Sequence, residues 1–80
     1  MPTVPITLEA RRKAMGELFR RARKGQGMTV IQVAVRAGVA QKVVEAVEHG
    51  GSVTVTSLLL VASVVGIQVD VTAVNMEAAP

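Results

Sequence analysis

The segment from Thr29 to Gly50 constrains the fold most, because its apolar residues recur at helical spacing while a glycine interrupts them. We predict two short helices joined by a tight turn at Gly38, since a left-handed backbone costs glycine little. Thr29 and Gln32 form a capping-box pattern at the start of the first helix. Ala40, which precedes the second helix, is a poor N-cap and marks a local weakness.

The second of these helices, from Gln41 to Gly50, has two faces of different character. Val44 and Val47 share one face and are expected to pack against the rest of the domain. The other face carries polar side chains, namely Gln41, Lys42, Glu45 and His49. We therefore expect one face to pack and the other to contact a partner.

A longer amphipathic helix is predicted before this segment. Thr7 fits its N-cap, the helix runs to about Lys24, and Gly25 and Gly27 end it. Its apolar side chains recur at intervals of three and four and are expected to form a single buried stripe: Leu8, Met15, Leu18, Phe19 and Ala22. Residues 1–6 are expected to be a flexible arm.

A fourth helix and a strand are predicted after the segment. Residues 52–55 are expected to be extended, and Thr56 fits the N-cap of a helix over 57–65 that is apolar nearly all round and therefore buried. Gly66 ends this helix, and residues 67–71 alternate with a period of two, which is typical of a half-buried strand. The prediction is a mainly α domain over 7–71 with a disordered tail over 72–80.

Composition limits how this domain is stabilised. A chain of 80 residues makes one small domain and buries only about 60% of its unfolded surface. It has no cysteine and one histidine, so it has no disulfide and is expected to bind no metal; no cofactor is expected either. Oligomerisation is the remaining aid to stability, and a homodimer is expected.

Charge is concentrated in the first predicted helix. Seven of the nine Lys and Arg lie between Arg11 and Lys24, interrupted only by Glu17, and such clusters favour a polyanion partner. The apolar run over 53–69 contains hydroxyl residues, glycine and glutamine, so we expect no membrane span and a cytoplasmic protein. The sequence shows no nucleophile with a base and no phosphate-binding glycine loop, so an enzyme is not expected.

Four groups of residues follow one another in order: Met15-Gly16-x-x-Phe19-Arg20-x-x-Arg23, Gly27-Met28-Thr29, Val33-Ala34-x-x-Ala37-Gly38-Val39 and Val44-x-x-Val47-Glu48-x-Gly50. Together they resemble the phage repressor and Cro class of helix-turn-helix proteins, the XRE family. The resemblance continues through Leu58-Leu59 to Val65-Gly66-Ile67 and covers roughly residues 15–71.

The resemblance implies a compact, four-helix, lambda-repressor-like domain. Such a domain binds double-stranded DNA as a homodimer, on a palindromic operator with half-sites about 34 Å apart. The ending from Val61 to Val71 is similar to the HipB-like antitoxin branch, in which a C-terminal strand takes part in the dimer. Ile67, Val69 and Val71 are therefore expected at the dimer interface, in an intermolecular sheet.

The resemblance also assigns base contacts to the helix that begins at Gln41. Gln41, Lys42 and Glu45 occupy family positions that face base edges, where they would select adenine, guanine and cytosine respectively. Val43 and Ala46 would meet thymine methyl groups. Ordinary solvated surface is the alternative for all three residues. For Glu45, discrimination against wrong sequences or a helix pair with Lys42 or His49 are further alternatives.

Other charged residues are assigned to the DNA backbone or to the fold. The residues expected to contact phosphate, which give affinity without sequence information, are Arg20, Arg21, Arg36 and Thr29. Arg23 and Glu48 match a family pair that joins the first helix to the end of the third. They are expected to form a structural salt bridge.

Two residues depart from the family pattern. The family usually has Gln where this chain has Val30, and Ser or Thr where it has Ala40, and each change removes a polar contact worth on the order of 1 kcal/mol. Three functions therefore stay open. The chain is a transcriptional repressor, an antitoxin that binds a toxin and autoregulates its operon, or an interaction module that lost DNA binding and docks a protein on Val30 and Val43.

Overall fold

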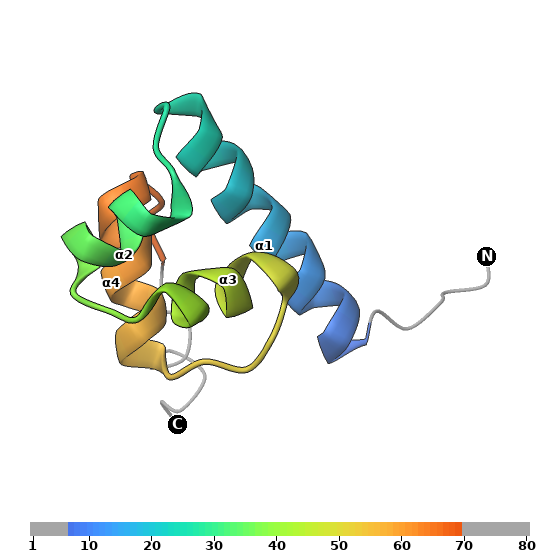
Figure 1. Ribbon diagram of the computed structural model, residues 1–80. Helices are drawn as coiled ribbons and strands as arrows, with labels where there is room; N and C mark the ends of the chain where they lie inside the picture. Colours follow the sequence, from blue (N-terminus) through green and yellow to red (C-terminus); the bar gives the residue numbers. More distant parts are fainter. Residues whose placement is uncertain (1–6, 70–80) are drawn as a thin grey trace, which may run out of the picture.

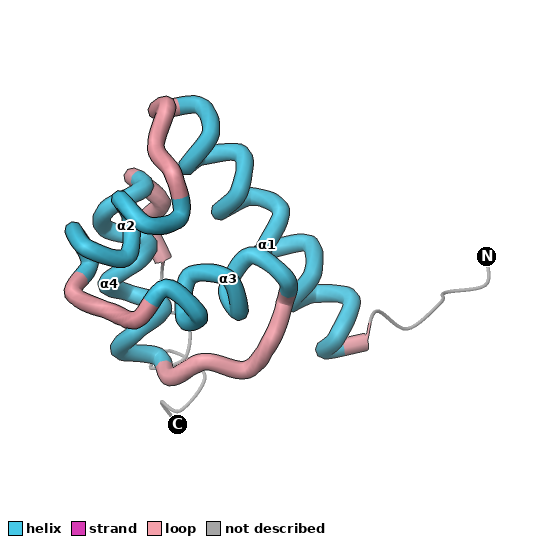
Figure 2. The backbone as a smooth tube through the Cα atoms, in the orientation of Figure 1, coloured by secondary structure: helices cyan, strands magenta, loops and turns pink. Residues whose placement is uncertain are grey.

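The computed structural model describes residues 7–69, which form four helices (Figure 1). They are α1 (Leu8–Gly25), α2 (Val30–Ala37), α3 (Gln41–His49) and α4 (Val55–Val65). α3 packs across α1, and α2 packs on both α3 and α4. Short loops join all four helices, as the tube in Figure 2 shows. The predicted mainly α, four-helix architecture is confirmed; the arm over 1–6 and the tail over 72–80 lie outside the described residues.

The α2–turn–α3 unit forms through the local signals that the sequence carries. Thr29 Oγ1 accepts a hydrogen bond from the Gln32 amide at 3.1 Å, and Gln32 Oε1 accepts one from the Thr29 amide at 2.9 Å. This capping box satisfies two amides at the start of α2. Gly38 ends α2 with φ +71°, in the left-handed region. At Ala40, as predicted, no side chain caps the start of α3.

The core is small and almost entirely aliphatic. Phe19, Val33, Val44 and Val61, one from each helix, are its largest fully buried side chains. The other buried apolar residues are Met28, Ala34, Ala37, Val47, Ala62 and Val65. Val44 and Val47 therefore hold α3 to the domain, as its predicted apolar face required.

The buried stripe predicted for α1 is narrower than expected. Phe19 is buried and Ala22 is half-buried, but Leu8, Met15 and Leu18 are exposed. Periodicity places these side chains on one side of the helix, but only part of that side lies under α3 and α4. The prediction was wrong for the three exposed residues, because the fully buried contact of α1 is confined to Gly16 and Phe19.

Two predictions about α4 are also corrected. Thr54, not Thr56, is the N-cap: its hydroxyl accepts a hydrogen bond from the Ser57 amide at 3.1 Å, so the helix begins at Val55. The helix is not buried all round, because Leu59 and Leu60 each expose about 40% of their surface. Only the side that carries Val61, Ala62 and Val65 packs into the core.

The predicted C-terminal strand is not found in the described part of the chain. Residues 67–69 follow α4 without regular secondary structure, and 70–71 lie outside the described residues. Ile67 and Val69 are half-buried and pack against the core of their own chain. A strand that needs a second chain stays a prediction.

Gly16 sets how closely α1 and α3 approach. A Cβ at this position would lie 2.5 Å from the Glu48 carbonyl oxygen and 2.6 Å from that of Val47. Both atoms belong to the backbone at the end of α3, so neither can yield without moving the helix. A residue larger than glycine here must push α3 away from α1.

We expect Gly16→Ala to lower the free energy of unfolding by about 1–3 kcal/mol, the usual cost of overpacking. Urea denaturation followed by circular dichroism measures this change. Gly25→Ala is the matched control, because nothing lies within 4 Å of a Cβ at the end of the same helix. Equal stability of the two variants would contradict the close packing of α1 on α3.

Candidate nucleic-acid interface

The outward face of α3 carries polar side chains that are free to contact a partner. Gln41, Lys42, Glu45 and His49 are all exposed, while Val44 and Val47 on the opposite face are buried. The Nδ1 atom of His49 lies 2.8 Å from the Glu45 carbonyl oxygen, which ties the imidazole to the last turn of the helix. The structure therefore presents together the three polar residues predicted to face base edges.

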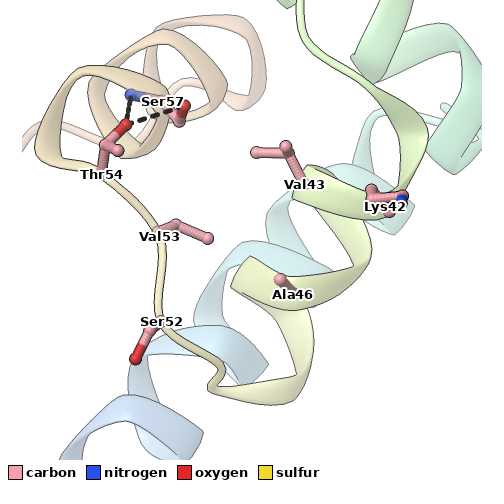
Figure 3. A pocket seen from close by; sticks show the side chains of 7 residues that line it. All are labelled: Lys42, Val43, Ala46, Ser52, Val53, Thr54 and Ser57. Carbon is pink, nitrogen blue, oxygen red and sulfur yellow. Dashed lines mark hydrogen bonds between the residues drawn. The ribbon is translucent and has the colours of Figure 1, made fainter.

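One flank of α3 borders an open groove of about 500 Å³. Val43 and Ala46 line it from α3, and Val53 faces them from the loop before α4 (Figure 3). Its remaining lining residues are Lys42, Ser52, Thr54 and Ser57. Lys42 is the only ionised side chain in this lining, so the groove is apolar with a cation at its edge. Sequence reasoning missed Val53, because nothing local showed that the loop turns back toward α3.

The other flank of α3 carries side chains of both charges. A cavity of about 410 Å³ lies there between α1 and α3. Its lining contains three carboxylates, two arginines, a valine and the histidine: Glu17, Glu45, Glu48, Arg20, Arg23, Val30 and His49. Val30 and Val43 thus line different cavities, and both are half-buried. A docking surface that includes both valines stays a prediction.

Arg23 and Glu48 form the principal ion pair of the domain. Arg23 Nε donates to Glu48 Oε2 at 2.6 Å and Nη2 donates to Oε1 at 3.0 Å, which makes the pair bidentate. Their side chains retain only 11% and 7% of their accessible surface. Arg23 Nη1 also donates to the Met28 carbonyl oxygen at 3.0 Å. The two residues that the resemblance paired therefore join α1, α3 and the loop before α2.

This environment favours the charged form of Arg23. The hydrogen bond to Glu48 raises the pKa of the guanidinium above its usual value, and burial opposes the rise. An arginine is already charged at any physiological pH. The consequence is structural: the charged guanidinium of Arg23 fixes the end of α3 to α1.

Four other residues were predicted to contact phosphate, and each has an intramolecular partner. Arg20 and Arg21 lie 3.8 Å and 3.5 Å from the carboxylate of Glu17 and are largely exposed. Arg36 Nη1 lies 3.1 Å from the sulfur of Met28, and the Thr29 hydroxyl caps α2. The ion pairs of Arg20 and Arg21 with Glu17 are at the surface, where such pairs contribute little, so these two guanidinium groups can exchange them for phosphate.

A family model described as Helix-turn-helix matches residues 19–71. The chain belongs to this XRE-type helix-turn-helix family. The match spans α2, the turn and α3, together with the C-terminal part of α1 and all of α4. No curated protein matches the chain. The family is one of DNA-binding regulatory domains rather than enzymes.

The described residues contain neither a metal-binding cluster nor a membrane-spanning helix. Within residues 7–69, no group of three or more His, Cys, Asp or Glu side chains is placed to hold a metal ion. Among the four described helices, none is both long and apolar enough to cross a membrane.

We expect Glu48→Ala to lower the free energy of unfolding by about 3 kcal/mol, because it leaves the mostly buried Arg23 guanidinium without its counter-charge. Glu17→Ala is the control, since it removes exposed pairs and should cost less than about 1 kcal/mol. Chemical denaturation of both variants compares the two costs. If they were equal, the pair would not hold α3 in place.

Proposed function

We propose that the protein is a sequence-specific transcriptional repressor that binds a palindromic operator as a homodimer. The observation that carries this proposal is the exposed polar face of α3 in a chain of the helix-turn-helix family. In this fold the second helix of the unit enters the major groove and its N-terminal residues contact base edges. Gln41 and Lys42 are the first two residues of α3.

Base selection follows from the hydrogen-bonding groups on this face. The Gln41 amide pairs with adenine through a donor and an acceptor, the Lys42 ammonium donates to guanine, and the Glu45 carboxylate accepts from cytosine. Glu45 also repels phosphate, which disfavours any register that brings it near the DNA backbone. The three side chains are exposed and need no rearrangement to reach a base.

The two flanks of α3 differ in charge. One carries three carboxylates beside Arg20 and Arg23, whereas the flank with Val43, Ala46 and Lys42 carries no carboxylate. A thymine methyl group fits the apolar surface of Val43 and Ala46, and Lys42 at its edge attracts a phosphate. Both residues keep the thymine-contacting role that the resemblance assigned to them.

Phosphate contacts supply the affinity that does not depend on sequence. We assign them to Arg20, Arg21, Arg36 and the Thr29 position at the start of α2. Seven of the nine Lys and Arg lie on α1, which gives the molecule a strongly basic side. Each neutralised phosphate releases counterions, so binding should weaken steeply as salt rises.

The homodimer is proposed to include the C-terminal segment. Ile67 and Val69 are half-buried in the single chain, which leaves part of each side chain available to a partner. Val71 lies outside the described residues. Paired strands from two chains would satisfy each other's backbone groups, which one isolated strand cannot do.

Selection of binding sites from random duplex DNA, followed by gel shifts at several salt concentrations, tests this function. We expect the wild type to enrich a palindrome with half-sites about one helical turn apart. The double variant Gln41→Ala, Lys42→Ala should bind all duplexes alike, because it loses base contacts and retains the basic residues of α1. Leu18→Ala, at an exposed position of α1, is the control and should keep the wild-type preference. Binding without any sequence preference by the wild type would refute the repressor.

Uracil substitution tests the thymine contact. Replacing thymines of the selected site one at a time removes single methyl groups, and we expect about a fourfold loss of affinity at one position per half-site, equivalent to ~0.8 kcal/mol. Val43→Ala should reduce this loss, whereas Val35→Ala on the exposed side of α2 should not. Equal affinity for all the substituted duplexes would show that Val43 and Ala46 meet no thymine methyl.

A further inference from the structure

The outer face of α4 is an apolar surface that no other part of residues 7–69 covers. Val55 exposes 63% of its surface, Leu59 exposes 40% and Leu60 exposes 41%. Helical spacing places them on one continuous side of the helix, together with the exposed Thr56 and Ser63. A helix that is apolar all round is normally buried all round, and here only the inner half is buried. The described residues, 7–69, therefore leave the outer half of α4 uncovered.

This face also lacks charge. Residues 50–69 contain no Asp, Glu, Lys or Arg, which makes α4 and its flanking loops the longest uncharged part of the described chain. The polar groups on and beside the face are partly satisfied within the chain. The Ser63 hydroxyl donates to the Leu60 carbonyl oxygen at 2.8 Å, and the Thr54 hydroxyl donates to Ser57 Oγ at 2.9 Å. If a partner covers the face, few polar groups therefore lose a hydrogen bond to water without having another partner.

We propose that a second copy of this chain covers the outer face of α4, so that the two α4 helices pack against each other across a two-fold axis. The inference rests on the proposed homodimer and gives it a surface. In a two-fold contact each patch meets its own copy, so the patch must be compatible with itself. An uncharged apolar helix face meets this condition, whereas a charged face would not.

The distribution of charge favours contact between two copies at the α4 face over contact at other exposed apolar residues. Two identical chains with net charge +3 repel each other, and most of the positive charge lies on α1. Two other strongly exposed apolar residues lie beside ionised ones: Leu18 is three residues from Arg21, and Val35 is adjacent to Arg36. On the α4 face, two basic molecules can meet without opposing like charges.

The small size of the core also favours contact with a second copy. The described chain buries ten apolar residues, only one of them aromatic. A domain of this size usually needs an additional source of stability, and without cysteine an oligomer is the available one. Ile67 and Val69 follow directly after α4, so a dimer that packs on α4 is continuous with the proposed C-terminal contacts.

Sedimentation equilibrium of the full chain, with helix content checked by circular dichroism, tests the proposal. We expect the wild type to dimerise and Leu60→Glu to raise the dimer dissociation constant by roughly tenfold or more, because it places a like charge on both sides of the contact. Ser63→Arg should do the same by bulk and charge, and it removes no buried apolar atom, so the single chain keeps its fold. Ile31→Glu is the matched control: it charges an equally exposed apolar residue on α2 and should leave the dimer intact.

The outcomes separate the two claims. A monomeric wild type would overturn both the homodimer and the α4 contact. A wild-type dimer that survives both Leu60→Glu and Ser63→Arg would overturn only the α4 contact and leave the C-terminal segment as the interface. A dimer that is disrupted equally by Ile31→Glu would place the contact on α2 and would also overturn the proposal.

Discussion

The junction of α1 with the end of α3 is the contact on which the rest of the domain depends. Two features act there together: the absence of a side chain at Gly16, which lets the helices approach, and the bidentate pair of Arg23 with Glu48, which fixes their angle. α3 has only nine residues and no side-chain cap at its start. A helix this short has little stability of its own, so its position is determined at its C-terminal end and by its buried valines.

This arrangement separates stability from recognition within one short helix. The residues that hold α3, Val44, Val47 and Glu48, alternate along the sequence with those assigned to DNA, Gln41, Lys42 and Glu45. Because a helix turns every 3.6 residues, the two sets occupy different faces. The recognition residues are therefore free to change with the operator, whereas Glu48 and Gly16 are constrained by each other's helix. The weak start at Ala40 adds to the reliance on the α1 junction.

Local signals in the sequence predicted most of the fold. The capping box at Thr29, the glycine at 38 and the helix stop at Gly50 act through atoms a few residues away, so they can be recognised without knowing the fold. The cap of α4 was misplaced because Thr54 and Thr56 both suit an N-cap, and the choice depends on how the loop leaves α3. The exposure of Leu8, Leu59 and Leu60 was missed for a related reason. Periodicity shows which side of a helix is apolar but not how much of that side another helix covers.

The incomplete cover of α4 also explains why charged and uncharged surfaces lie on different helices. The sequence places most of the positive charge on α1 and none on residues 50–69, and the helix in that uncharged stretch was predicted to be core. In the described structure the other three helices cover only one side of α4. One side of the molecule is then suited to a polyanion and another to a surface without charge. In a two-fold dimer these requirements are compatible: neutral α4 faces can pair while both basic α1 helices stay exposed, and the two α3 helices can then bind related half-sites on one duplex.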